Sequence, residues 1–251
     1  MRNTRSGGPA AAMAATLMVW ARVAAAQPAG EPMDPAVSFS ADVTVTQAIV
    51  DRSGKITREL PASRYRLERL DGGGLRTTML ATRHSPARGP LADAYAGITV
   101  DVDPATGTLR ARDARGVELT TPPPAAGAAP AADDDSTLVV APGDRPRRLA
   151  ALVSQYGRPI GSVRSLERYL ARRGRVIEEM LVAPDTAVPI ELNRLEDGVL
   201  VEHHAFEYAP VGDGRLVRVR ARSEAALPER QGERLVSLTM LSDIRVKGAA
   251  R

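Results

Sequence analysis

The residues best suited to chemistry form one short stretch, Glu202-His203-His204, with Glu207 close behind. Imidazole and carboxylate groups are both ligands of zinc. Successive side chains of a strand point to opposite faces, so His203 and His204 cannot both reach one metal ion from a regular strand. His204 and Glu202 can share a face, but two ligands fall short of a zinc site. We therefore expect no metal here, and instead two histidines on a half-exposed strand.

Residues for catalysis are not found in any recognisable arrangement. The chain has no cysteine and no G-x-S-x-G motif, and His84 lies in a loop rich in Pro, Gly and Arg without a visible partner. The acidic run Asp133–Asp135 lacks the spaced acids and closing Glu of a calcium loop. Gly72–Gly74 do not lead from a strand into a helix, as a phosphate-binding loop would. The sequence predicts no catalytic residue, no metal site, no cofactor and no enzymatic activity.

Arginines alternate with small apolar residues along Leu216–Arg222. This alternation predicts a strand with one face toward a core and the other toward water. The apolar members are Val217, Val219 and Ala221, and the polar members are Arg218, Arg220 and Arg222. We expect the arginines to form a solvated sheet face, with a rim for anionic headgroups or an acidic partner as the functional alternative.

The strands that position these residues form a run from Val176 to Val246. Asp197-Gly198 between two apolar alternations predicts a hairpin, because a type I′ turn needs positive φ at both central positions. A second turn is expected at Pro184–Thr186. The last strand is expected to bury one parity: Val236, Leu238, Met240, Ile244 and Val246. Short turns between five strands predict an antiparallel meander.

The N-terminal half has the same character. Alternation in Phe39–Val50 puts Phe39, Ala41, Val43, Val45 and Ile49 on one face. Further short strand patterns follow as KITREL, SRYRLERL, LRTTMLATR, AGITVDV and TLRAR, separated by turn residues. A second meander is expected.

One helix interrupts the strands. Asp144 can cap it, Pro146 fits its first turn, and Gly157 can end it. Its single apolar stripe consists of Leu149, Leu152, Val153 and Tyr156. Residues 162–173 suit either a helix or a hairpin arm, and the neighbouring strands favour a strand.

Residues 1–26 have the features of a secretory signal peptide. Arg2 and Arg5 precede the apolar stretch Ala10–Trp20, which is too short to span a bilayer, and Ala24–Ala26 offer a cleavage site. We expect cleavage near Ala26 and a soluble periplasmic or extracellular protein, because no cysteine is present to carry an acyl anchor. Loss of this segment removes three arginines and no acidic residue, which leaves a near-neutral chain unlike a nucleic-acid binder.

Residues 27–251 are expected to form a single β-rich domain. Residues 120–137 are rich in Pro, Ala and Asp and cannot bury enough apolar surface to order themselves. They are either a disordered insertion or a boundary between two domains. We favour the insertion, because each β half alone has only a modest set of core residues.

The layout of the chain resembles the periplasmic lipoprotein-carrier superfamily, the LolA/LolB-like group. The resemblance lies in FSADVTVTQ followed by GKITREL and YRLERL, in VIEEMLVAPDTAVPIELNRLEDGVLVEHHAFEYAPV, and in the closing SLTMLSDIRV. It implies a curved antiparallel half-barrel with one or two helices on its concave face, which shields acyl chains or other amphiphiles. The chain departs from it in having few aromatic residues and the insertion at 120–137.

Two functions follow as expectations. The first is a non-enzymatic envelope protein that binds or carries a lipid, an acyl chain or a lipoprotein in an apolar concave face. The second is a structural or interaction module of the bacterial cell envelope, with a filled core, no ligand and another envelope protein as partner. The expected apolar site residues are Leu149, Leu152, Val217, Val219, Val236, Leu238 and Met240.

Overall fold

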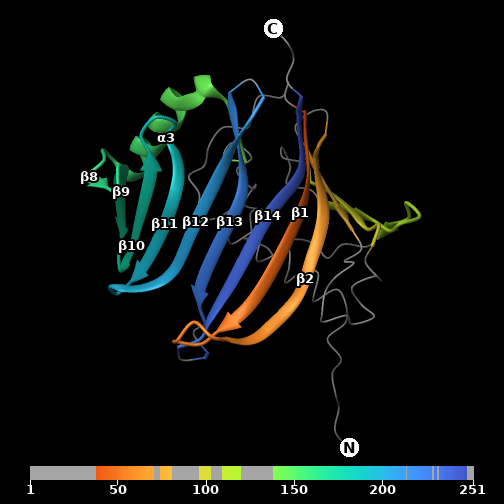
Figure 1. The fold of residues 1–251 in the computed structure, drawn as a ribbon, viewed down its shortest axis with the longest axis horizontal. Coiled ribbons are helices and arrows are strands. Elements are labelled where there is room, and N and C mark those ends of the chain that lie inside the picture. The colour runs from red at the N-terminus through yellow and green to blue at the C-terminus, as the bar shows by residue number, and fades with distance from the viewer. Residues whose placement is uncertain are drawn as a thin grey trace, which may run out of the picture.

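The computed structural model describes residues 38–70, 74–80, 96–102, 109–119, 138–212, 214–227, 229–230 and 232–247. The expected signal peptide (1–26), the whole of the proposed insertion (120–137) and His84 lie outside these residues. The described part is one curved, open antiparallel sheet of 14 strands with a helix at one end (Figure 1). The mainly β fold and the antiparallel half-barrel expected from the sequence are confirmed. Among the described residues, no helix is long and apolar enough to cross a membrane.

The N-terminal meander supplies one end of the sheet. Its strands are β1 (Ser38–Val50), β2 (Ile56–Arg69), β3 (Leu75–Met79), β4 (Thr99–Val102), β5 (Leu109–Arg112) and β6 (Glu118–Leu119). Each strand pairs with the next along the chain, so the order in the sheet follows the order in sequence. This local pairing agrees with the turn residues that separate the strand patterns.

The C-terminal meander supplies the other end. Its strands are β8 (Gly161–Val163), β9 (Leu166–Arg173), β10 (Val176–Ala183), β11 (Val188–Glu196), β12 (Val199–Val211), β13 (Arg215–Ala226) and β14 (Arg234–Lys247). Residues 162–173 are therefore strands, as favoured. Asp197 and Gly198 have φ of 50° and 80°, which confirms the hairpin turn that needs both values positive.

The two meanders are joined by the first and last strands. β1 and β14 are antiparallel neighbours, from the pair Ser38–Lys247 at one end to Val50–Arg234 at the other. They run side by side through the middle of the sheet (Figure 1). The short strand β7 (Val139–Val140) lies off the main path and pairs with β13.

The helix α3 (Arg145–Tyr156) follows the short 3₁₀ helix η2 (Pro142–Asp144). Asp144 precedes α3 but its carboxylate makes no capping hydrogen bond, and it lies 3.8 Å from Arg148 instead. Gly157 ends α3 with φ of 79°, and its N–H donates to the carbonyl of Val153. The start and stop of the helix agree with the sequence, although Asp144 does not cap it as expected.

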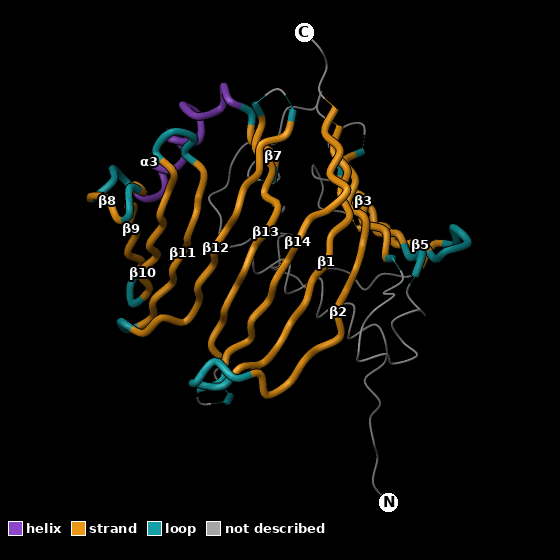
Figure 2. The backbone as a smooth tube through the Cα atoms, viewed as in Figure 1, coloured by secondary structure: helices purple, strands orange, loops and turns teal. Residues whose placement is uncertain are grey.

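Two buried clusters lie on the concave face. The first cluster is centred on β1, β2 and β7 and contains Phe39, Ala41, Val43, Val45, Tyr65, Leu67, Leu138, Val139 and Val217. The second cluster joins α3 to β9–β12 and contains Leu152, Tyr156, Tyr169, Ala171, Met180, Val182, Ala187, Leu192 and Phe206. Figure 2 shows α3 at the β8–β11 end and β7 beside β13. The inward parity of β1 expected from the sequence is confirmed.

The set of alternating residues expected on the buried face of β14 is wrong for the first half of the strand. Val236, Leu238 and Met240 pair with Ala48, Thr46 and Thr44, on the face opposite to the buried residues of β1. The two strands change register between Ser40 and Asp42, where Asp243 has φ of 50°. This β-bulge switches the parity, so that Leu241, Ile244 and Val246 pack together on the first cluster.

The expected solvated face of β13 is also interrupted. Arg220 and Arg222 are exposed and pair with Glu207 and Glu224, as expected for a solvated face. Arg218 is only 5% exposed, and its guanidinium lies 5.4 Å from the ring centre of Phe206 in the second cluster. The register between β12 and β13 shifts here, with Val219 left out of the pairing. This shift turns Arg218 inward, which alternation alone does not reveal.

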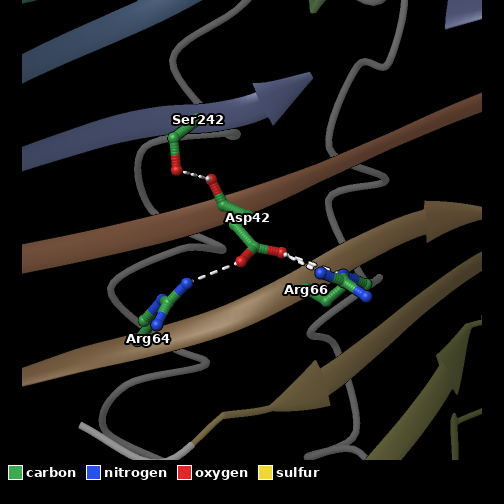
Figure 3. A network of polar contacts seen from close by, with 4 residues as sticks. All are labelled: Asp42, Arg64, Arg66 and Ser242. Atoms are coloured by element: carbon green, nitrogen blue, oxygen red, sulfur yellow. Dashed lines mark hydrogen bonds and ion pairs between the residues drawn. The ribbon is translucent and has the colours of Figure 1, made fainter. Parts of the chain in front are cut away.

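An ion-pair network fixes the outer face where β1 meets its neighbours. The carboxylate of Asp42 accepts hydrogen bonds from Arg64 at 2.7 Å and from Arg66 at 2.9 Å, both on β2. The hydroxyl of Ser242 on β14 donates to the carbonyl of Asp42 at 3.5 Å (Figure 3). Asp42 is buried, and its carboxylate charge is compensated by both arginines, so the network ties three strands together.

The corrected parity of β14 gives a paired test. Leu241→Asp puts a carboxylate into the first cluster and is expected to lower the free energy of unfolding by about 2 kcal/mol or more. Met240→Asp, on the exposed outer face, is expected to cost less than about 0.5 kcal/mol. Urea unfolding followed by circular dichroism measures both. A larger loss for Met240→Asp would contradict the register.

Candidate functional site

The candidate site is the concave face under and beside α3. Leu152 and Tyr156 project from the helix into the second cluster and are 3% and 6% exposed. They pack with Tyr169, Met180 and Phe206, which come from three different strands. An apolar stripe laid on a sheet accounts for the position of the helix, because burial of such side chains stabilises by about 1.5–3 kcal/mol each.

Arginines fasten one end of α3 to the sheet. Arg145 donates to the carbonyl of Pro184 at 2.9 Å, and Arg148 donates to the carbonyl of Thr186 at 3.0 and 2.7 Å. Both acceptors belong to the turn between β10 and β11. Burial lowers the pKa of Arg148, and the nearby Asp144 carboxylate acts in the opposite direction. The N-terminal end of α3 is thus held by directional hydrogen bonds, whereas Leu152 and Tyr156 hold the C-terminal half by apolar contact.

Several buried polar atoms of this face make no hydrogen bond within the described structure. They are the hydroxyls of Tyr156 and Tyr208 and both ring nitrogens of His204. By contrast, Tyr169 donates to Glu167 at 2.8 Å. Burial raises the pKa of Tyr208 to about 12, despite the opposing effect of Arg218 and Arg148. Unpaired buried hydroxyls are uncommon in filled cores, because each costs about 1–3 kcal/mol.

A polar row crosses the same face next to the second cluster. His204, Ser223, Ser237 and Gln47 are successive register partners on β12, β13, β14 and β1. Gln47 Nε2 donates to Ser237 Oγ at 3.0 Å. The row adjoins the second cluster at His204. His204 is the register partner of Leu192, and the His204 ring is nearly parallel to the Phe206 ring, with 6.3 Å between the ring centres. We name these four residues the polar row.

The structure separates the seven apolar residues expected at the site. Leu149 and Leu152 lie on α3 against the second cluster, and Val217 is fully buried in the first cluster. Val219 is half-buried at the register shift. Val236, Leu238 and Met240 lie on the outer face and are not brought together with the others. Their binding of a ligand stays a prediction.

The polar row was missed because nothing in the local sequence marks it. Ser223 and Ser237 look like solvent-facing strand residues, yet the side chain of Ser237 is buried. The burial of His204 could have been predicted from the two-residue period of a strand. His204 and Phe206 lie two residues apart and therefore share a face, which is the apolar face of β12. His204 was expected to be half-exposed and is 6% exposed.

His203 lies on the other side of the sheet from His204. Its Nδ1 is 2.7 Å from Asn193 Oδ1, and the Asn193 amide donates to Glu179 at 3.0 Å. The separation of the two histidines to opposite faces agrees with the sequence-based interpretation. Within the described residues, no group of three or more His, Cys, Asp or Glu side chains is placed to hold a metal ion.

A polar hollow of about 400 Å³ lies on the outer face over β2–β5. Glu68, Arg76 and Arg112 contribute to its lining. Asp101 accepts two hydrogen bonds from Arg76, at 2.7 and 2.9 Å, and lies 3.8 Å from Arg112. Asp113 also lines the hollow, so both arginines are matched by acidic groups and neither is offered as an unpaired cation to a ligand.

Comparison with known proteins identifies distant structural relatives only. No protein-family model and no curated protein matches the sequence. A LolA superfamily protein from Nitrosomonas europaea is similar over 92% of this chain and 94% of its own, with 16% identity and a TM-score of 0.44. A Vibrio parahaemolyticus domain, named provisionally for outer membrane lipoprotein sorting, is similar over 94% and 93%, with 8% identity and a TM-score of 0.41. The LolA superfamily, which the sequence layout resembles, thus occurs among the structural matches, but at these TM-scores no residue role is transferred.

The buried phenol of Tyr208 predicts a sensitivity to alkali. Its pKa of about 12 in the folded state exceeds the value of about 10 in an unfolded chain. The associated stability is therefore present below pH 10 and is lost as the pH rises toward 12. Tyr208→Phe should show a shallower fall in unfolding free energy between pH 9 and pH 11, as measured by urea titration. Equal slopes for the variant and the parent would contradict the burial of this hydroxyl.

Proposed function

We propose that this protein is an exported, non-enzymatic envelope protein that binds or carries a lipid, an acyl chain or a lipoprotein on its concave face. In this proposal α3 is a lid over the second cluster. The features of residues 1–26 support export to the periplasm or beyond. The partner is then a membrane-derived amphiphile, or a protein that bears one.

The observation that carries this proposal is the unpaired polar groups beneath the helix. The hydroxyl of Tyr156 is buried without a hydrogen bond at the end of α3 that lacks the arginine contacts. An unpaired buried hydroxyl costs about 1–3 kcal/mol, which weakens the closed position of this end. Opening it would release the hydroxyl to water while the arginines keep the other end attached.

Opening also uncovers a surface suited to an acyl chain. Met180, Leu192 and Phe206 are buried under the helix and would line the exposed face. Each methylene of a bound chain contributes about 0.8 kcal/mol when it leaves water. About eight methylenes would therefore offset the loss of the contacts made by Leu152 and Tyr156, whose burial contributes about 1.5–3 kcal/mol each.

A second function is favoured by the closeness of packing under α3. Tyr169, Met180 and Val182 are at most 1% exposed, as in a filled core. In this case the protein is a structural or interaction module of the envelope, whose partner is another envelope protein. The two functions differ in whether α3 moves.

A substitution in α3 separates them. Leu152→Asp places a charge in the second cluster, and in a filled core it is expected to lower the free energy of unfolding by several kcal/mol. If α3 is a lid, the loss is limited to the apolar contacts given up when the helix lifts, because the charge then reaches water, and binding of a fluorescent fatty acid should change. Thermal unfolding and fluorescence titration are the two measurements.

Val153→Asp is the matched control, since Val153 is the next residue on the helix and is exposed. It is expected to change neither stability nor binding. A severe loss of stability for Leu152→Asp, with no fatty acid bound by the parent protein, would favour the interaction module.

A further inference from the structure

The polar row contains hydrogen-bond donors for which the described part of the chain supplies no acceptor. Ser237 Oγ accepts a hydrogen bond from Gln47 Nε2, so its own proton is directed elsewhere and can be donated. Ser223 is the register partner of both Ser237 and His204. Neighbouring strands lie about 4.8 Å apart, so these three side chains can contact a single headgroup.

His204 gives the row its strongest indication of a ligand. The side chain is 6% exposed, and neither ring nitrogen makes a hydrogen bond within the described structure. A neutral imidazole always carries one N–H donor. A buried donor and a buried acceptor without partners lower the stability of the folded protein. Such groups in native structures are usually satisfied by a water molecule, an ion or a ligand.

The charges near His204 favour an anionic ligand over a cationic one. The acid two residues away on β12 is Glu202, whose carboxylate lies 4.0 Å from His204 Nε2 and is also 3.7 Å from Arg194. On the other side, the buried guanidinium of Arg218 lies over Phe206, the ring that stacks with His204. The polar row itself contains no carboxylate.

We propose that the polar row is a headgroup subsite, in which His204, Ser223 and Ser237 donate hydrogen bonds to the oxyanion of an amphiphile. The ligand class is a long-chain carboxylate or phosphate, with its chain on the apolar residues of the concave face. This proposal rests on the proposed carrier function and specifies its ligand. It also explains a buried histidine that packing alone leaves unsatisfied.

Movement of α3 gives the ligand access to this subsite. Leu192 and Phe206 flank His204 in register and along β12, and both lie in the second cluster with Leu152 and Tyr156. Lifting the C-terminal half of α3 removes the cover from these neighbours. The headgroup can then enter beside the stacked rings.

The test compares probes that share one chain and differ in the headgroup. Equilibrium dialysis at pH 8 measures oleate, oleyl phosphate, oleyl alcohol and methyl oleate against the full mature chain, below the concentrations at which the probes self-associate. Oleate or oleyl phosphate is expected to bind at least 10-fold more tightly than both neutral probes. Preference between oleate and oleyl phosphate tells a carboxylate from a phosphate subsite.

Substitutions in the polar row show which residues are responsible for the preference for anionic probes. His204→Phe and Ser237→Ala should each reduce binding of the anionic probe at least 10-fold and change binding of oleyl alcohol less than 2-fold. His203→Phe is the matched control, on the opposite face of the same strand, and should change neither. His204→Phe should not lower the melting temperature, because it replaces an unpaired buried ring by an apolar one of similar shape.

Equal binding of charged and neutral probes, or full retention of the preference in His204→Phe, would overturn the headgroup subsite and leave the carrier function standing. Failure of all four probes to bind the parent protein would overturn the carrier function and the subsite with it.

Discussion

The pairing of β1 with β14 is the contact on which the rest of the structure depends. Each meander can form from local turns, but neither alone offers a continuous concave face. The pairing joins the two halves and sets the register of everything on either side. The polar row exists because Gln47 on β1 lies opposite Ser237 on β14, and the first cluster takes residues from both strands. On the outer face of the same strand pair, the Asp42 carboxylate accepts hydrogen bonds from two arginines of β2 and so fixes the register of β2 against β1 (Figure 3).

That single register divides the sheet into two faces with different chemistry. The outer face carries compensated ion pairs such as Arg220 with Glu207 and Arg76 with Asp101. The concave face carries the apolar clusters, α3 and the buried groups of Tyr156, Tyr208 and His204, which make no hydrogen bond within the described residues. Within the described residues one short helix covers part of this face. Such a face is suited to an amphiphile, because its chain can replace protein contacts and its headgroup can accept hydrogen bonds from the polar row. The proposed function and ligand class both follow from this division.

Local features of this fold could be predicted from the sequence, and long-range ones could not. The Asp197-Gly198 hairpin and the end of α3 at Gly157 were predictable because each depends on the backbone preferences of one or two residues. The buried face of β1 could be predicted because its polar and apolar residues alternate. In β14 both parities contain apolar residues, and the bulge at Asp243 switches between them, so Val236, Leu238 and Met240 were placed on the wrong face. Arg218 was misplaced for the same reason, by a register shift that leaves no mark in the sequence.

The measurement that tests the proposed function most directly is mass spectrometry of an organic extract from the protein, produced with residues 1–26 in a bacterial host and purified without detergent. We predict a lipid or fatty acid with an anionic headgroup, in near-stoichiometric amount, that disappears when residues of the polar row are replaced. A protein that is consistently free of any lipid, and that takes none up when mixed with membrane extract, would contradict it and favour the interaction module.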